Sequence, residues 1–192
     1  MQFKILTLLL FVLNLTNPAM AQKYLSTENV EVSKEWNGNT FTSAKTFVEN
    51  ISESKSLQFF AEIVADEELQ AVLEKEEMVT IFVIADSSFL EIPEKSRDSI
   101  LGNKELTLSM VKYLSVPGRL DSNSLKMAVS KNDGKAYLAT LSGEKIGVRE
   151  VSGKLQLVDS ENRTATIIES DFYHKKGFFH IVDGLVFPIS EK

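Results

Sequence analysis

An unbroken run of apolar and β-branched residues, Val79-Thr80-Ile81-Phe82-Val83-Ile84-Ala85, constrains the fold of this chain more than any other feature. Its β-branched and aromatic side chains favour a strand over a helix, and the run has no polar side to present to water. It therefore predicts a central strand that is covered on both faces. Asp86-Ser87-Ser88 follows and is typical of a strand-to-helix turn with capping side chains.

Segments before and after this strand in the sequence have apolar residues at helical spacing. Apolar residues stand at i, i+3, i+4 and i+7 at Leu57, Phe60, Ala61 and Val64. The pattern resumes after Asp66, a predicted N-cap, and later helices are expected to begin near Pro93 and at Asn103. Pro117-Gly118 is expected to end the last of these.

Short strand-like runs dominate the chain beyond Gly118, apart from one short helix expected at 122–129. They cover residues 135–141, 145–151, 154–158, 164–170 and 178–182, and turn signals such as Asn132-Asp133-Gly134 separate them. Helices come first and a strand meander second, so the sequence predicts an α+β fold.

The composition excludes several classes of protein. The chain has 192 residues, 27 Asp or Glu, 21 Lys or Arg, a formal charge of −6 and no Cys. One domain is expected at this length. The acidic balance argues against nucleic acid as a partner, and the absence of Cys excludes zinc ribbons and thiol chemistry.

Residues 1–21 are predicted to be a cleaved signal peptide. Lys4 supplies the positive start, Ile5 to Leu15 form the apolar region, and Ala19-Met20-Ala21 has the A-x-A cleavage pattern. The apolar run is shorter than the ~20 residues that span a membrane, so no stable insertion is expected after cleavage. The protein is therefore expected to be secreted or periplasmic, and an exported chain without Cys favours a bacterial source.

Three separated stretches resemble the conserved blocks of the fasciclin (FAS1) domain family. Thr80-Ile81-Phe82-Val83-Ile84-Ala85-Asp86-Ser87-Ser88-Phe89 is similar to the block T-V-F-A-P-T-N-x-A-F, and Tyr113-Leu114-Ser115-Val116-Pro117-Gly118 is similar to Y-H-V-V-P-G. Gly177-Phe178-Phe179-His180-Ile181-Val182-Asp183-Gly184-Leu185-Val186-Phe187-Pro188 is similar to N-G-V-I-H-V-I-D-x-V-L-L-P. The chain is thus identified as a single-domain secreted member, with a lead-in at 22–41 and the fasciclin domain at 42–190.

The resemblance implies N-terminal helices packed on a mainly antiparallel β-wedge or sandwich. It also implies non-covalent interaction: adhesion to a cell surface or matrix, or binding of another envelope protein. Tyr113, Val116 and Pro117 mark the expected recognition edge, and Phe172 with Tyr173 could add an exposed aromatic patch. Leu114 replaces the family's His, so no role of that His is carried over.

No residue pattern indicates catalysis or a cofactor. The two histidines, His174 and His180, are interpreted as a loop residue and a hydrogen-bonded structural residue, because Lys175-Lys176 opposes a metal site between them. No G-x-S-x-G elbow, phosphate loop or dinucleotide motif is present. Asn162-Arg163-Thr164 is a glycosylation sequon in what we expect to be a polar loop. The alternative function is a carrier for a small apolar ligand in a crevice between helices and sheet.

Overall fold

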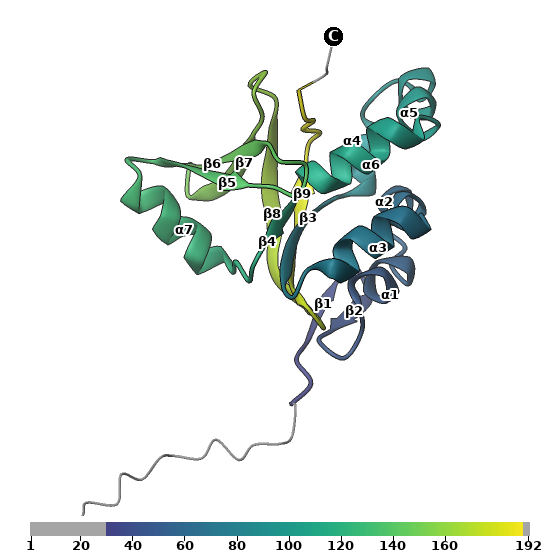
Figure 1. Cartoon of the computed structure of the whole chain (residues 1–192), viewed down its shortest axis with the longest axis horizontal. Helices are drawn as coiled ribbons and strands as arrows, with labels where there is room; N and C mark the ends of the chain where they lie inside the picture. Colours follow the sequence, from purple (N-terminus) through teal and green to yellow (C-terminus); the bar gives the residue numbers. More distant parts are fainter. Residues whose placement is uncertain (1–29, 190–192) are drawn as a thin grey trace, which may run out of the picture. The chain divides into compact units, whose positions relative to one another are not determined.

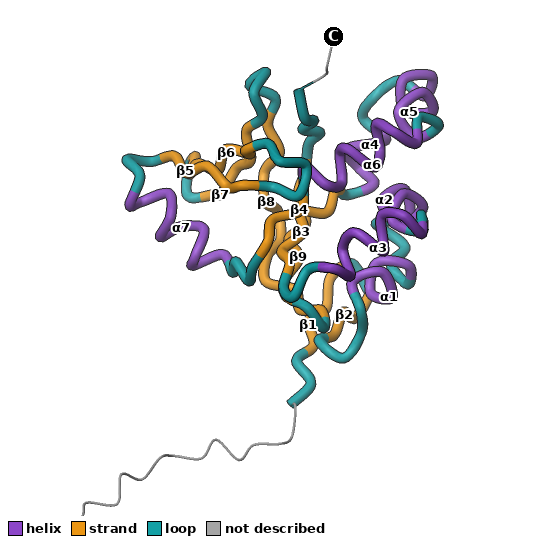
Figure 2. The backbone as a smooth tube through the Cα atoms, viewed as in Figure 1, coloured by secondary structure: helices purple, strands orange, loops and turns teal. Residues whose placement is uncertain are grey.

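The computed structural model describes residues 30–189, so the predicted signal peptide at 1–21 lies outside the described residues. The helices are α1 (Phe47–Ser52), α2 (Gln58–Val64), α3 (Glu67–Lys75), α4 (Asp86–Leu90), α5 (Glu94–Leu101), α6 (Lys104–Tyr113) and α7 (Ser122–Lys131). The strands are β1 (Ser33–Trp36), β2 (Asn39–Thr42), β3 (Val79–Ile84), β4 (Ser115–Pro117), β5 (Lys135–Ala139), β6 (Lys145–Val151), β7 (Lys154–Val158), β8 (Thr164–His174) and β9 (Gly177–Asp183). The predicted α+β class is confirmed (Figures 1 and 2).

Strand β3 lies inside a seven-stranded sheet of order β4-β3-β9-β8-β7-β6-β5. It pairs antiparallel with β4 and parallel with β9, and the other neighbours in this sheet are antiparallel. All six of its residues are buried, which confirms the predicted strand with two covered faces. β9 also buries six of its seven residues, so this neighbouring strand is covered on both faces as well.

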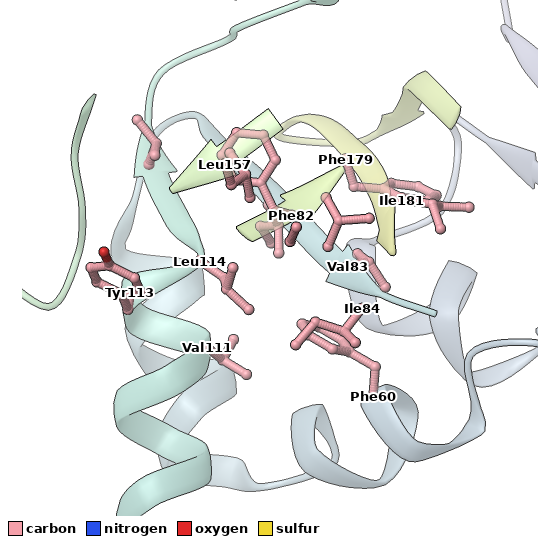
Figure 3. Close-up of a cluster of buried hydrophobic side chains, with 14 of the residues drawn as sticks. Phe60, Phe82, Val83, Ile84, Val111, Tyr113, Leu114, Leu157, Phe179 and Ile181 are labelled. Atoms are coloured by element: carbon pink, nitrogen blue, oxygen red, sulfur yellow. The ribbon is translucent and has the colours of Figure 1, made fainter. Parts of the chain in front are cut away.

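Helices cover the sheet in two groups. Phe47 of α1, Phe60 of α2 and Leu69 of α3 join the core cluster that contains Ile81 and Phe179. Leu125 and Val129 of α7 join the same cluster through β5 and β6. Figure 3 shows Val111 and Leu114 turned toward the side chains around Ile84. Each fully buried large apolar side chain of this kind contributes roughly 1.5–3 kcal/mol.

The β1–β2 hairpin is tied to the core by Phe41. Its ring is 1% exposed and lies edge-on to the rings of Phe172 and Phe179, at centroid distances of 5.1 and 5.3 Å. Buried Asn50 accepts a hydrogen bond from the Thr42 amide and donates one to the Thr42 carbonyl, both at 2.9 Å. The sequence predicts that the lead-in ends at residue 41 and the domain begins at residue 42, and both residues belong to β2. This domain boundary stays a prediction.

The sequence suggested that Asp86 caps the helix that it begins, but the structure shows that it caps a different one. Helix α4 has no side-chain cap, and the Asp86 carboxylate instead accepts the amide hydrogens of Gln58 and Phe59 at 2.9 and 3.0 Å. It therefore caps the first turn of α2, since the two elements meet at the end of β3. Ser88 donates to Asp183 and accepts the Gly184 amide, which joins the first resembling block to the third.

Two other expectations change near the ends of strands. Helix α6 ends at Tyr113, before Pro117-Gly118, because Ser115–Pro117 pairs with β3 as strand β4. Strand β8 continues to His174 instead of ending at Ser170. Irregular register between Ile167 and Phe172, with a left-handed Asp171 at φ 62°, lets the strand continue through a polar stretch.

Candidate interaction edge

The predicted recognition residues Pro117 and Tyr173 lie at the end of the sheet where β3 begins. Pro117 of β4 and Gly177 of β9 both pair with Val79, one on each side of β3. We call the accessible residues at this end, Met78, Pro117, Arg119 and Tyr173, the interaction edge. Pro117 and Arg119 are exposed, Tyr173 is half-buried, and Met78 is 43% exposed.

Aromatic rings and one guanidinium group form the centre of the interaction edge. Tyr173 and Phe178 face each other across β8 and β9, with ring centroids 4.7 Å apart. The Arg119 guanidinium carbon lies 5.0 Å from the Phe178 centroid and 6.0 Å from that of Tyr173. Within residues 30–189, Arg119 has no carboxylate oxygen within 4.0 Å. Its charge can therefore pair with an acidic group of a partner.

Hydrogen bonds fix the loop that carries Arg119. The Thr80 hydroxyl donates to the Gly118 carbonyl and accepts the Leu120 amide, both at 2.8 Å. His180 bonds the Leu120 carbonyl through Nε2 at 2.8 Å and accepts the Asp171 amide at Nδ1. Burial lowers the pKa of His180, so the neutral ring serves as a structural link, as its sequence position indicated.

His174 is a buried link at the same end of the sheet, so its interpretation as a loop residue was wrong. It ends β8 and is 5% exposed. Nε2 lies 3.1 Å from the Val79 carbonyl oxygen and Nδ1 accepts the Lys176 amide. Desolvation lowers its pKa to about 4, which keeps the ring neutral at pH 7.

The structure separates the five predicted contact residues into two groups. Tyr113, Val116 and Phe172 are buried, with 1%, 5% and 0% exposure, and Pro117 and Tyr173 are accessible. The buried three have no side-chain surface to offer a partner in this conformation. Their role here is packing: Phe172 stacks on Phe179 with a centroid distance of 4.9 Å.

Tyr113 is held by the interior around it. Its hydroxyl donates to the Lys145 carbonyl at 3.4 Å, and burial raises its pKa to about 12. The neighbouring Leu114, which stands where the resembling family has His, is fully buried. A His side chain at position 114 would have to give up its hydration to occupy this buried site.

Sequence reasoning missed Arg119 and Met78 as parts of the interaction edge. Arg119 directly follows Pro117-Gly118, and Met78 directly precedes the central strand. The signal that could have pointed to these two residues was their place next to the family-like blocks at 113–118 and 80–89. The pairing of β3 with β4, which brings them to one end of the sheet, could not be derived from local spacing.

A cavity of about 260 Å³ lies on the helix side of the same sheet end. Leu73 of α3, Phe47 of α1 and Val79 and Ile81 of β3 supply apolar walls, and His174 lies at its sheet side. Lys176 also lines it, with its ammonium group donating to the Glu74 and Glu76 carbonyls. This is a crevice between helices and sheet of the kind that the carrier alternative requires.

Neither a metal centre nor a membrane helix is found in the part of the chain that the structure describes. No group of three or more His, Asp or Glu side chains in residues 30–189 is arranged to hold a metal ion. None of the helices within this range is long and apolar enough to cross a membrane. Asn162 of the sequon lies in an exposed turn at φ 64°, so the expected polar loop is confirmed.

Comparison with known proteins assigns the family. The model of the Fasciclin domain matches residues 55–188. The chain belongs to the fasciclin domain family. This domain is 22% identical to human Periostin over 144 residues, which is 75% of the chain and 16% of Periostin.

A solved structure supports the fold of this fasciclin domain. A FAS1 domain pair from the insect cell adhesion molecule Fasciclin I superposes with a TM-score of 0.54 at 18% identity, covering 67% of this chain and 44% of that one. At this identity the likeness concerns the fold alone. The chain thus spans less than half of the length of either relative, each of which contains further sequence.

Proposed function

We propose that this fasciclin domain is exported and acts by non-covalent binding of a protein on a cell surface, in the matrix or in the envelope, through the interaction edge. The observation that carries the proposal is the Arg119 guanidinium over the rings of Phe178 and Tyr173, beside exposed Pro117. Arginine and tyrosine are enriched among the residues that dominate binding energy at interfaces.

Rigidity of the interaction edge supports the same proposal. Thr80 and His180 hold the loop at 118–120, so Arg119 loses little backbone freedom when a partner binds. The insect relative, Fasciclin I, is a cell adhesion molecule, and this also supports the proposal. An acidic side chain on the partner would complement Arg119 and add a charge-assisted hydrogen bond.

Binding of purified protein to cells of the source organism tests this function. We expect Arg119→Glu and Tyr173→Ala each to weaken surface binding by about tenfold, equivalent to ~1.4 kcal/mol. Lys131→Glu, at the exposed end of α7, makes the same change in charge and should leave binding unaltered. Equal losses in Arg119→Glu and Lys131→Glu would mean that net charge, and not this edge, governs binding.

Export is tested separately by the mass of the protein recovered from the extracellular or periplasmic fraction. We expect the mature chain to begin at Gln22, after cleavage behind Ala21. Recovery of the intact chain from the cytoplasm alone would contradict export.

The carrier function is a second candidate, and the cavity beside Leu73 and His174 favours it. Its volume of about 260 Å³ suits only a small molecule. Native mass spectrometry of the purified protein should detect such a ligand in near-stoichiometric amount. Leu73→Phe, which places a larger ring against the cavity, should release it, and a ligand-free wild-type protein would count against this candidate.

A further inference from the structure

A second surface, distinct from the interaction edge, lies on the side of β5–β7 that faces away from α7. Registers between these strands place Gly147 on it together with the side chains of Lys135, Tyr137, Ala139, Lys145, Arg149, Val151, Lys154, Gln156 and Val158. Alternate residues such as Ala136, Ile146 and Val148 point into the core toward α7. Figure 1 shows α7 along one side of these strands, and the described chain places no helix on the other. We call this side the outer face.

The outer face is cationic on an acidic protein. Lys135, Lys145, Arg149 and Lys154 have no carboxylate oxygen within 4.0 Å in the described range. Arg149 donates instead to the neutral Gln156 amide oxygen, at 2.8 and 3.0 Å. Four unneutralised cations gathered in this way, in a chain of net charge −6, create a local positive potential.

Three nearby acids are bonded to groups other than these four cations. Asp159 and Glu161, in the turn after β7, both pair with Arg163. The Glu144 carboxylate accepts the amide hydrogen of Ile189. The outward positions of β5, β6 and β7 hold no Asp or Glu.

A hollow of about 500 Å³ lies on the outer face above Gly147. Lys135, Tyr137, Lys145, Ser160 and Asn162 line it. Val158 and Asp159 also contribute to the lining, and the Asp159 side chain is fully buried and paired with Arg163. A side chain at Gly147 would fill its floor, because a Cβ there would lie 2.9 Å from Lys135 Cε and 3.1 Å from the Val158 carbonyl oxygen. The volume is in the range of ~300–1,000 Å³ that is typical of small-molecule sites.

Tyr137 supplies an aromatic wall for this hollow. Its side chain is 62% exposed, and the Lys135 ammonium lies 4.8 Å from its ring centroid. An exposed ring beside amide and hydroxyl groups suits a sugar. The C–H face of a pyranose can stack on the electron-rich ring, while its hydroxyls bond to Ser160 and Asn162.

We propose that the outer face binds a carboxylated polysaccharide, with one uronate unit in the hollow. The ring of this unit stacks on Tyr137, and its carboxylate pairs with Lys135 and Lys145. Neighbouring acidic units of the polymer extend over Arg149 and Lys154. This site is independent of the proposed protein-binding function, because it shares no residue with the interaction edge.

Two other polyanions fit these observations less well. An acidic peptide gains most by pairing with an open strand edge, whereas the hollow lies over Gly147, whose strand is already paired on both sides. Nucleic acid carries one negative charge per ~1.7 Å of duplex, and the acidic remainder of this protein would repel it.

Binding of polygalacturonate to the purified full chain, measured by isothermal titration calorimetry, tests the proposal. We expect saturable binding that weakens several-fold between roughly 50 and 300 mM salt, and no binding of neutral dextran. Lys135→Gln/Lys145→Gln should weaken it by at least about tenfold, and Tyr137→Ala should also weaken it. The matched control is Lys126→Gln/Lys131→Gln on α7, which removes two exposed charges away from the outer face.

Each outcome decides for or against this site. Loss of binding in the outer-face variants with unchanged circular dichroism, and retention in the control, supports it. Absent binding of polygalacturonate, equal loss in the control, or tighter binding of poly-glutamate or single-stranded DNA overturns it. Intact cell binding by the outer-face variants would show that the interaction edge works separately.

Discussion

Replacement of His174 should remove a specific part of the protein's sensitivity to acid. The ring is 5% exposed and links the end of β8 to the Val79 carbonyl and the Lys176 amide. Burial lowers its pKa to about 4, from an ordinary value of 6.5. His174→Asn keeps an N–H donor at this position but cannot titrate in this range.

The sign of the effect follows from the depressed pKa. The unfolded state binds the proton more tightly than the folded state, so the stabilisation by neutral His174 is fully present above pH 6.5. It is lost as the pH falls from 6.5 toward 4. Between about pH 7 and pH 4.5, this residue alone should lower the free energy of unfolding of the wild type by about 2 kcal/mol.

Urea denaturation of both proteins at these two pH values measures the difference. The wild type should lose about 2 kcal/mol more than His174→Asn on acidification, because carboxylate contributions are common to both and cancel. The variant will also be less stable at pH 7, and that offset does not enter the comparison. An equal loss in the two proteins would refute the assignment of His174 as a buried neutral link.

Three further substitutions test the packing that holds the interaction edge, each by urea denaturation. Gly177→Ala should lower the free energy of unfolding by more than ~2 kcal/mol, because the new Cβ would lie 2.2 Å from the Val79 carbonyl oxygen and the backbone φ is +150°. The control is Gly134→Ala, whose Cβ would meet no atom within 4 Å and which should cost only about 1 kcal/mol. Asn50→Ala should cost about 1–3 kcal/mol, because the buried Thr42 amide loses its partner and the Thr42 carbonyl keeps only the Lys45 amide, and it should expose the hairpin to protease. Phe179→Ala should cost about 3–5 kcal/mol through the cavity left among the rings of Phe41, Phe47 and Phe172. A cost below ~1 kcal/mol for Phe179→Ala would show that this cluster is loosely packed.

Strong local patterns made the centre of this fold predictable. The apolar run from Val79 has one physical solution, a strand buried on both sides, and β3 confirms it. The helical spacing from Leu57 onward also corresponds to α2 and α3. These features depend on neighbours in the sequence, which is why they can be derived from it.

Features that depend on distant pairing could not be predicted in the same way. Ser115–Pro117 has no strand pattern of its own and becomes β4 only because β3 lies beside it. His174 follows the polar stretch Glu169-Ser170-Asp171, which interrupts alternation, so the continued strand and the burial of the ring were hidden.

Of the five contact residues predicted from the sequence, the structure leaves only two accessible. The resembling block at 113–118 leads to the end of the sheet where Pro117 and Tyr173 are accessible, and binding at this end stays a prediction. Tyr113 and Val116 are buried because the same block also has to pack against the core. Arg119, the only charged member of the interaction edge, owes its place to contacts with Tyr173 and Phe178 from the far end of the chain.

Photo-crosslinking from the interaction edge tests the central claim most directly. A photoreactive benzoylphenylalanine at position 117, where Pro117 is exposed, should form a covalent adduct with a surface protein of the source cells. The same group at exposed Lys131 on α7 should form none. Adducts of equal yield from both positions, or from position 131 alone, would contradict binding through this edge.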